Sequence, residues 1–218
     1  RGLGDVYKRQ LWWLILNGPI LTFRPSKSGK AYQKIWDKDN HGSPLRKFTI
    51  NQTSKLKKIF ESYNNISIEY AMIYGTPEIE KTLHRLTKKG CSKILLVPLY
   101  PQYAASTSAT VKDEVFKWML KQRWQPDLRT IAPWFDNHNY IKALAETVKK
   151  NIINKNKLDK LIVSFHGIPK RYFMAGDPYH CHCIKSARLL KEELKWPDDK
   201  ILVTFQSRFG PEPWLQPY

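Results

Sequence analysis

Hydrophobic residues gather in four short runs, and each run is followed directly by a side chain that could take part in chemistry. The runs are Ile66–Ile73, Ile94–Leu99, Leu161–Phe165 and Ile201–Phe205. The residues that follow them are Tyr74, Tyr100, His166 and Gln206. Short runs rich in Val, Ile and Leu, separated by helical patterns, are typical of parallel strands that are buried on both faces of a sheet. Ligands of such sheets bind beyond the carboxyl ends of the strands, so we expect these four side chains to lie in a site.

Before and between the runs, apolar residues recur at the spacing of one helix face. This spacing predicts helices over Leu45–Tyr63, Pro77–Lys89, Thr107–Gln122, Asn139–Asn151 and His182–Lys195. Thr76 is the expected N-cap of the helix that starts at Pro77, because proline is favoured at the first helical position. Gly90 is the expected residue just past its end.

The strand–helix–strand pattern occurs twice, with a change of character over Pro126–Pro133. We therefore predict an α/β protein with two doubly wound, Rossmann-like parallel-sheet domains that face each other across a cleft. The predicted domains are residues 11–130 and 131–218, both incomplete. Residues 1–10 are polar and without periodicity, and we expect a foreign or disordered leader there.

Composition narrows the range of partners. The chain has 218 residues and a net charge of +18, from 37 Lys and Arg against 19 Asp and Glu. This balance favours an anionic partner, such as nucleic acid, an anionic membrane surface or an acidic small molecule. The alternative is a bias in composition that has no functional meaning.

Three cysteines do not make a disulfide framework and indicate a reducing compartment. No apolar stretch reaches the roughly 20 residues that span a bilayer.

His166 is the candidate with the clearest chemistry. A histidine at a strand end can accept a proton near neutral pH or bind a divalent metal, although such a residue can also be a structural hydrogen bonder. Gly167, the next residue, allows a close backbone approach to a ligand.

Three motifs resemble those of the ferrochelatase family. They are Ser164–Tyr172 (Ser-Phe-His-Gly-Ile-Pro-Lys-Arg-Tyr), Thr204–Tyr218 and Leu99–Thr107 (Leu-Tyr-Pro-Gln-Tyr-Ala-Ala-Ser-Thr), and the resemblance runs from about Leu11 to Tyr218. It implies a chelatase-type fold and the insertion of ferrous iron into protoporphyrin IX or coproporphyrin III, which forms haem. His166 is then the proton acceptor, the iron ligand or both.

The resemblance also implies the residues that bind the substrate. The aromatic residues of the cleft are Tyr74, Tyr100, Tyr103 and Trp214, and the polar or charged ones are Arg24, Ser43, Gln206 and Ser207. Arginine suits the propionates of a porphyrin because its planar fork can bind a carboxylate at two points. The family's acidic residue opposite the histidine is missing from this sequence, so we expect the stretch alone to be inactive.

The remaining expectations concern cofactors, partners and location. No organic cofactor is implied, and three cysteines cannot supply the four thiolates of an iron–sulfur cluster, so His180-Cys181-His182-Cys183 is not expected to hold one. Leu11–Phe23 resembles an apolar lip that touches a membrane. We expect a cytoplasmic protein, with or without peripheral membrane contact, and no nucleic-acid partner.

The alternative functions are another tetrapyrrole metal chelatase, a porphyrin carrier and a basic RNA-binding module. The oligomeric state stays open.

Overall fold

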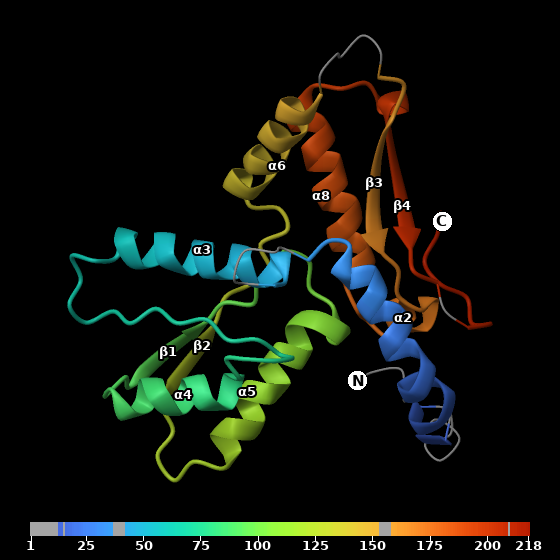
Figure 1. Ribbon diagram of the computed structural model, residues 1–218. Coiled ribbons are helices and arrows are strands. Elements are labelled where there is room, and N and C mark those ends of the chain that lie inside the picture. Colours follow the sequence, from blue (N-terminus) through green and yellow to red (C-terminus); the bar gives the residue numbers. More distant parts are fainter. Residues whose placement is uncertain (1–12, 15, 37–41, 153–157, 209) are drawn as a thin grey trace. The chain divides into compact units, whose positions relative to one another are not determined.

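The computed structural model describes residues 13–14, 16–36, 42–152, 158–208 and 210–218, which contain both helices and strands (Figure 1). The helices are η2 (Leu16–Ile20), α2 (Leu21–Gln33), α3 (Pro44–Ile59), α4 (Ile79–Lys88), η3 (Ala105–Ala109), α5 (Thr110–Leu120), α6 (His138–Asn151), α7 (Lys170–Met174), α8 (Tyr179–Leu194) and η5 (Asp198–Lys200). The strands are β1 (Lys93–Leu96), β2 (Asp127–Thr130), β3 (Leu161–His166) and β4 (Ile201–Gln206). The α/β class predicted from the sequence is confirmed.

The chain divides into two compact units that each contain two stretches of sequence. The first unit comprises Arg1–Ile94 and Lys112–Leu128, and the second comprises Leu95–Val111 and Arg129–Tyr218. The segment that carries Tyr100 and Tyr103 therefore belongs with the second unit. The boundary predicted after residue 130 stays a prediction for the whole protein.

The second unit is built on the parallel pair β3–β4. The strands pair in register from Leu161 with Ile201 to His166 with Gln206. Helices α6 and α8 pack together and cover one face of the pair, where a core cluster forms. Its buried residues are Ala145, Leu190 and Leu194, packed against Leu161, Val163 and Ile201. Figure 1 shows α8 running beside the two strands.

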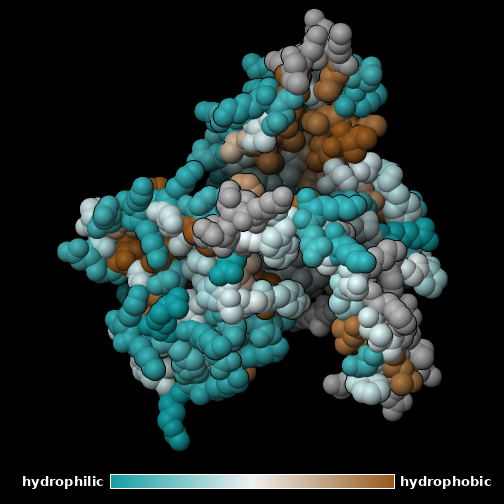
Figure 2. All heavy atoms as spheres, viewed as in Figure 1, coloured by the Kyte–Doolittle hydropathy of each residue, from teal (hydrophilic) through white to brown (hydrophobic). Residues whose placement is uncertain are grey.

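The other face of β3–β4 is exposed, which corrects the expectation of strands buried on both faces. Burial alternates along β3, and Ile162 and Leu202 are 62% and 45% exposed. Figure 2 shows hydrophobic residues at the surface in this region. The physical reason is that successive side chains of a strand point to opposite faces of the sheet. Among the described helices of this unit, α6 and α8 pack on the pair, and they cover the face with the inward-pointing side chains.

The first unit has its core between α4 and α5. Leu83, Val115 and Trp118 are buried, and the Trp118 indole N–H donates to His84 Nε2 at 3.2 Å. The two rings also meet edge to face, with centroids 5.5 Å apart. This unit is therefore held by helix packing around one buried tryptophan.

Most predicted helices are confirmed, with shifted ends, and one predicted strand is wrong. Residues 66–71 form no strand, and Met72 makes only an isolated bridge with Glu78. The N-cap of α4 is Glu78 rather than Thr76, whereas Gly90 follows its end at φ +87° as predicted. No helix among the described residues is long and apolar enough to cross a bilayer.

Candidate active site

The carboxyl ends of β3 and β4 bring His166 and Gln206 side by side in the second unit. They are partners in the strand register, and both are exposed. The Gly167 N–H donates to the Gln206 carbonyl at 2.7 Å, which carries the pairing one residue beyond the strand end. Two predicted site residues are thus placed together by the backbone itself.

The His166 ring is oriented by its own neighbour. Its Nδ1 lies 2.8 Å from the Gly167 carbonyl oxygen. A carbonyl oxygen only accepts hydrogen bonds, so we assign the proton of the neutral ring to Nδ1. Nε2 then keeps its lone pair, which can accept a proton or bind a metal.

Gly167 is needed for packing at the end of β3, and the close approach of a ligand to its backbone stays a prediction. A Cβ at this position would lie 2.9 Å from the Gln206 carbonyl oxygen and 3.3 Å from the Trp214 ring. Contacts under 3.0 Å to backbone atoms force the chain to shift. The glycine therefore lets the turn after β3 lie close to β4 and to Trp214.

The last residues of the chain pack against the turn that follows β3. Trp214 is only 7% exposed and forms an antiparallel bridge with Pro169. Backbone bonds from Leu215 N–H to the Ile168 carbonyl and from Lys170 N–H to the Pro213 carbonyl hold the two segments together. Most of the Trp214 indole is used in this packing, and its role as a cleft wall stays a prediction.

Ser207 comes directly after β4 and has a left-handed backbone. Its φ is +69°, an uncommon value for a residue with a side chain, and the residue is exposed. Residues in such conformations often cluster at functional sites, where the surrounding structure holds them. The turn presents Ser207 next to Gln206.

The segment that carries Tyr100 and Tyr103 is tied to the start of α8. The Ala105 N–H donates to Asp177 Oδ2 at 2.7 Å, and the Tyr103 N–H donates to His182 Nδ1 at 3.1 Å. Tyr100 is 40% exposed, and Tyr103 is half-buried. Sequence reasoning missed Asp177 as a partner of this segment; its position next to Pro178, five residues before the predicted helix start at His182, was the available signal.

Side chains at the start of α8 also pack into the core beside the carboxyl ends of β3 and β4. Cys183 is fully buried, and burial raises the pKa of its thiol to about 12. Burial also raises the pKa of Tyr179, whose hydroxyl has the Cys183 side chain and the His166 backbone as hydrogen-bond partners. The strand end that carries His166 therefore rests on a packed, uncharged layer, which includes Phe205.

The residues His180-Cys181-His182-Cys183 do not converge on one point. The His180 ring stacks on Phe205, Cys181 is exposed, and Cys183 is buried. Within the described ranges, no group of three or more His, Cys, Asp or Glu side chains is arranged to hold a metal ion. Cys91, the third cysteine, lies in the first unit.

Three predicted substrate-binding residues lie in the first unit. Tyr74 is 87% exposed, and Ser43 caps α3 without a side-chain hydrogen bond to the helix. Arg24 lies in α2, and its side chain is outside the described part of the chain. Their convergence with the residues of the second unit stays a prediction.

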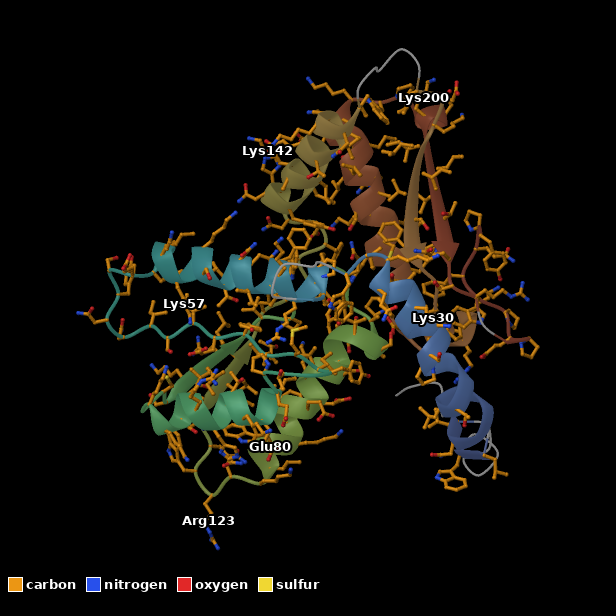
Figure 3. The ribbon with its side chains drawn as sticks, in the orientation of Figure 1. Lys30, Lys57, Glu80, Arg123, Lys142 and Lys200 are labelled. Carbon is orange, nitrogen blue, oxygen red and sulfur yellow. The ribbon has the colours of Figure 1, made fainter. Side chains whose placement is uncertain are left out.

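Positive charge is spread over several elements. Figure 3 shows Lys57 on α3, Lys142 on α6 and Lys200 on η5. In the first unit, Lys57, Arg85 and Lys89 all lie within 3.9 Å of the Glu69 carboxylate, which neutralises part of the charge. The labelled lysines thus lie on helices of both units.

The fold is of the chelatase type. A solved structure titled SirB from Bacillus subtilis with Fe3+ matches with a TM-score of 0.54, over 78% of this chain and 64% of that one. The sequence identity is 17%, so this likeness shows the fold alone. It agrees with an α/β chain that contains a parallel pair of strands.

The chain belongs to the ferrochelatase family. The family's profile matches residues 4–218, which includes part of the segment predicted as a leader. Ferrochelatases of Allorhizobium ampelinum and Rhizobium meliloti are 52% and 51% identical over 97% of this chain. The chain spans 62% and 63% of the length of these two relatives. The family that the three motifs resemble is therefore confirmed.

Proposed function

We propose that the whole protein is a ferrochelatase, which inserts ferrous iron into protoporphyrin IX or coproporphyrin III. The family membership and the relatives that carry this name support the proposal. The observation that carries it is the hydrogen bond between His166 Nδ1 and the Gly167 carbonyl. Because this bond places the ring proton on Nδ1, the Nε2 lone pair stays available on an exposed ring at the strand ends.

The reaction exchanges two protons for one metal ion. The porphyrin loses its two pyrrole protons, its four nitrogens bind the iron, and the iron stays ferrous, so no oxidant or reductant is needed. In this scheme the His166 Nε2 lone pair accepts a pyrrole proton as general base, binds the incoming iron, or does both in turn.

The macrocycle is large, flat and anionic at its propionates, and the proposed substrate-binding residues suit these properties. Tyr100 and Tyr103 of the second unit offer aromatic surface, and Gln206 and Ser207 offer hydrogen bonds beside His166. Trp214 and Tyr74 add further aromatic surface to the proposed set. Ser43 and Arg24 complete it, with Arg24 assigned to a propionate.

We also propose a cytoplasmic protein that touches a membrane surface through residues 11–23. Trp13, Leu14 and Leu21 are 62%, 60% and 53% exposed, and exposed apolar side chains with basic flanks suit the interface of a bilayer. The substrates are the porphyrin and ferrous iron, without an organic cofactor.

The test uses a completed chain, defined as this sequence with the remaining segments of the Allorhizobium ampelinum ferrochelatase added. His166→Ala should abolish iron insertion while porphyrin fluorescence still reports binding. His138→Ala is the matched control, because His138 is also an exposed histidine of the second unit. Insertion that survives in His166→Ala would remove this residue from the reaction, and a completed chain that inserts cobalt but no iron would favour another chelatase.

The same assay applied to the 218-residue chain tests the expectation that this stretch is inactive alone. We propose that it binds porphyrin weakly and inserts no iron, because a base without its acidic partner gives an incomplete proton path. Insertion by the short chain would contradict this part of the proposal.

A further inference from the structure

His182 lies outside the residues proposed to bind substrate, yet it bonds directly to the backbone of one of them. The Tyr103 N–H donates to His182 Nδ1 at 3.1 Å, across 79 residues of sequence. Because a backbone N–H only donates, Nδ1 must be unprotonated, and the proton of the neutral ring sits on Nε2.

The His182 ring is held in place by a stacked neighbour. Its plane lies 11° from that of Phe135, and the ring centroids are 3.7 Å apart. The segment that carries Phe135 is itself tied to α8, because Ser186 Oγ donates to the Phe135 carbonyl at 2.8 Å and Lys185 pairs with Asp136 at 2.7 Å. The acceptor nitrogen is therefore fixed in direction as well as position.

Two further bonds fix the segment on either side of Tyr103. Asp177 Oδ2 accepts from the Ala105 N–H, and Gln102 Nε2 donates to Ser186 Oγ at 3.0 Å. Loss of the His182 bond would therefore leave the segment attached to α8. The change would be confined to the Tyr103 backbone and the direction of its side chain.

We propose that His182 is a positioning residue, whose unprotonated Nδ1 holds the Tyr103 backbone so that the Tyr103 side chain faces the porphyrin. This inference rests on the proposed function for its consequence, but the bond itself can be tested separately. His182 touches no reacting atom in this scheme and acts only through Tyr103.

The bond should depend on pH. Burial lowers the pKa of His182, the nearby carboxylates of Asp136 and Asp177 oppose that shift, and the Lys185 ammonium adds to it. The ring is therefore neutral above its ordinary value of 6.5 and becomes protonated at a lower pH. A proton on Nδ1 would face the Tyr103 N–H, so the bond is present at neutral pH and lost in acid.

Two variants test the hydrogen-bond acceptor and the aromatic ring of His182 separately. His182→Asn keeps an acceptor close to the position of Nδ1 but does not titrate. His182→Phe keeps an aromatic ring against Phe135 but has no acceptor. The first readout is hydrogen exchange of the Tyr103 amide in the completed chain labelled with 15N-tyrosine.

In the unchanged protein, the Tyr103 amide should be protected from hydrogen exchange at neutral pH. In acid it should lose this protection, judged after the ordinary pH dependence of amide exchange has been subtracted. His182→Asn should keep it protected in acid, and His182→Phe should leave it unprotected throughout. A protected amide in His182→Phe, or the same acid loss in His182→Asn as in the unchanged protein, would overturn the proposal.

The second readout is kinetic. His182→Phe should raise KM for the porphyrin about fivefold, because the loss of one ordinary hydrogen bond changes an equilibrium by about this factor. The kcat of this variant should change little, and His182→Asn should have the KM of the unchanged protein. An unchanged KM in His182→Phe would overturn the positioning role. If the completed chain inserts no metal, the proposed function fails, and the amide result still decides whether His182 holds Tyr103.

Discussion

The segments Ile66–Tyr74 and Leu161–His166 look alike in sequence, yet they differ in the structure. Each is an apolar run that ends in a side chain able to take part in chemistry. Leu161–His166 pairs in register with a second strand, and Phe165 packs against the core cluster that includes Phe205 and Cys183. Residues 66–71 have no ladder among the described residues, and Tyr74 is 87% exposed.

The comparison shows that an apolar run becomes a strand only where a neighbour meets its backbone groups. Each strand residue offers an N–H and a C=O that must find partners. β4 supplies them for β3, and the bond from Gly167 N–H to the Gln206 carbonyl extends this support to the candidate site. The strand end with a partner holds its functional residue in a defined direction.

The largest expected contrast is in stability. Phe205→Ala should lower the free energy of unfolding by about 3–5 kcal/mol, because it leaves a cavity at a side chain that is 1% exposed. Tyr74→Ala should change it by less than about 0.5 kcal/mol. Urea denaturation of the two variants measures the difference, and equal losses would show that the ends of the two apolar runs are supported alike.

The next contrast is in cysteine reactivity. Burial raises the pKa of Cys183 to about 12, whereas Cys181 is exposed and Cys91 of the first unit is half-buried. The thiolate is the reactive form, so alkylation of Cys183 in the native protein should be at least about a hundredfold slower than that of Cys181. Mass spectrometry after timed iodoacetamide treatment measures the rates, with the urea-unfolded protein as control. Comparable native rates would mean that the layer under His166 opens readily.

A smaller effect is expected from an added methyl group. Gly167→Ala should cost about 1–3 kcal/mol, because its Cβ would meet the Gln206 carbonyl oxygen at 2.9 Å. Gly29→Ala in α2 is the control, since a Cβ there meets nothing within 4 Å. Alanine is the better helix former, so this control should be neutral or slightly stabilising. A Gly167 variant as stable as the control would argue against a close strand contact.

The smallest effect is expected at a surface ion pair of the second unit. Arg171 Nε lies 2.6 Å from Glu212 Oε1, with the two side chains 40% and 21% exposed. Arg171→Ala should therefore cost only about 0.2–1 kcal/mol in the free energy of unfolding. A double-mutant cycle with Glu212→Ala in low and high salt isolates the pair. A coupling that exceeds this range and persists in high salt would show that side-chain pairing, and not the backbone, holds the end of the chain.

The helices α6 and α8 and the strands β3 and β4 of the second unit were predictable, because their signals are local. Asn139–Asn151 and Leu161–Phe165 carry clear periodicities, and the structure confirms them within one residue as α6 and β3. Ile66–Ile73 carries an equally clear pattern, but pairing depends on which chain segments come next to it. The same limit applies to Trp214, whose burial against Pro169 follows from a contact 45 residues away in sequence.

The amino-acid order alone determined the family, the class of fold and the identity of the strand-end histidine, because short motifs and periodicities survive without knowledge of any contact. Only the tertiary structure decided which ring nitrogen of His166 keeps its lone pair, why Gly167 is a glycine, and that His182 meets the Tyr103 backbone. These depend on atoms within about 3 Å of one another that are brought together by packing, and direction at that range is not encoded in the spacing of residues along the chain.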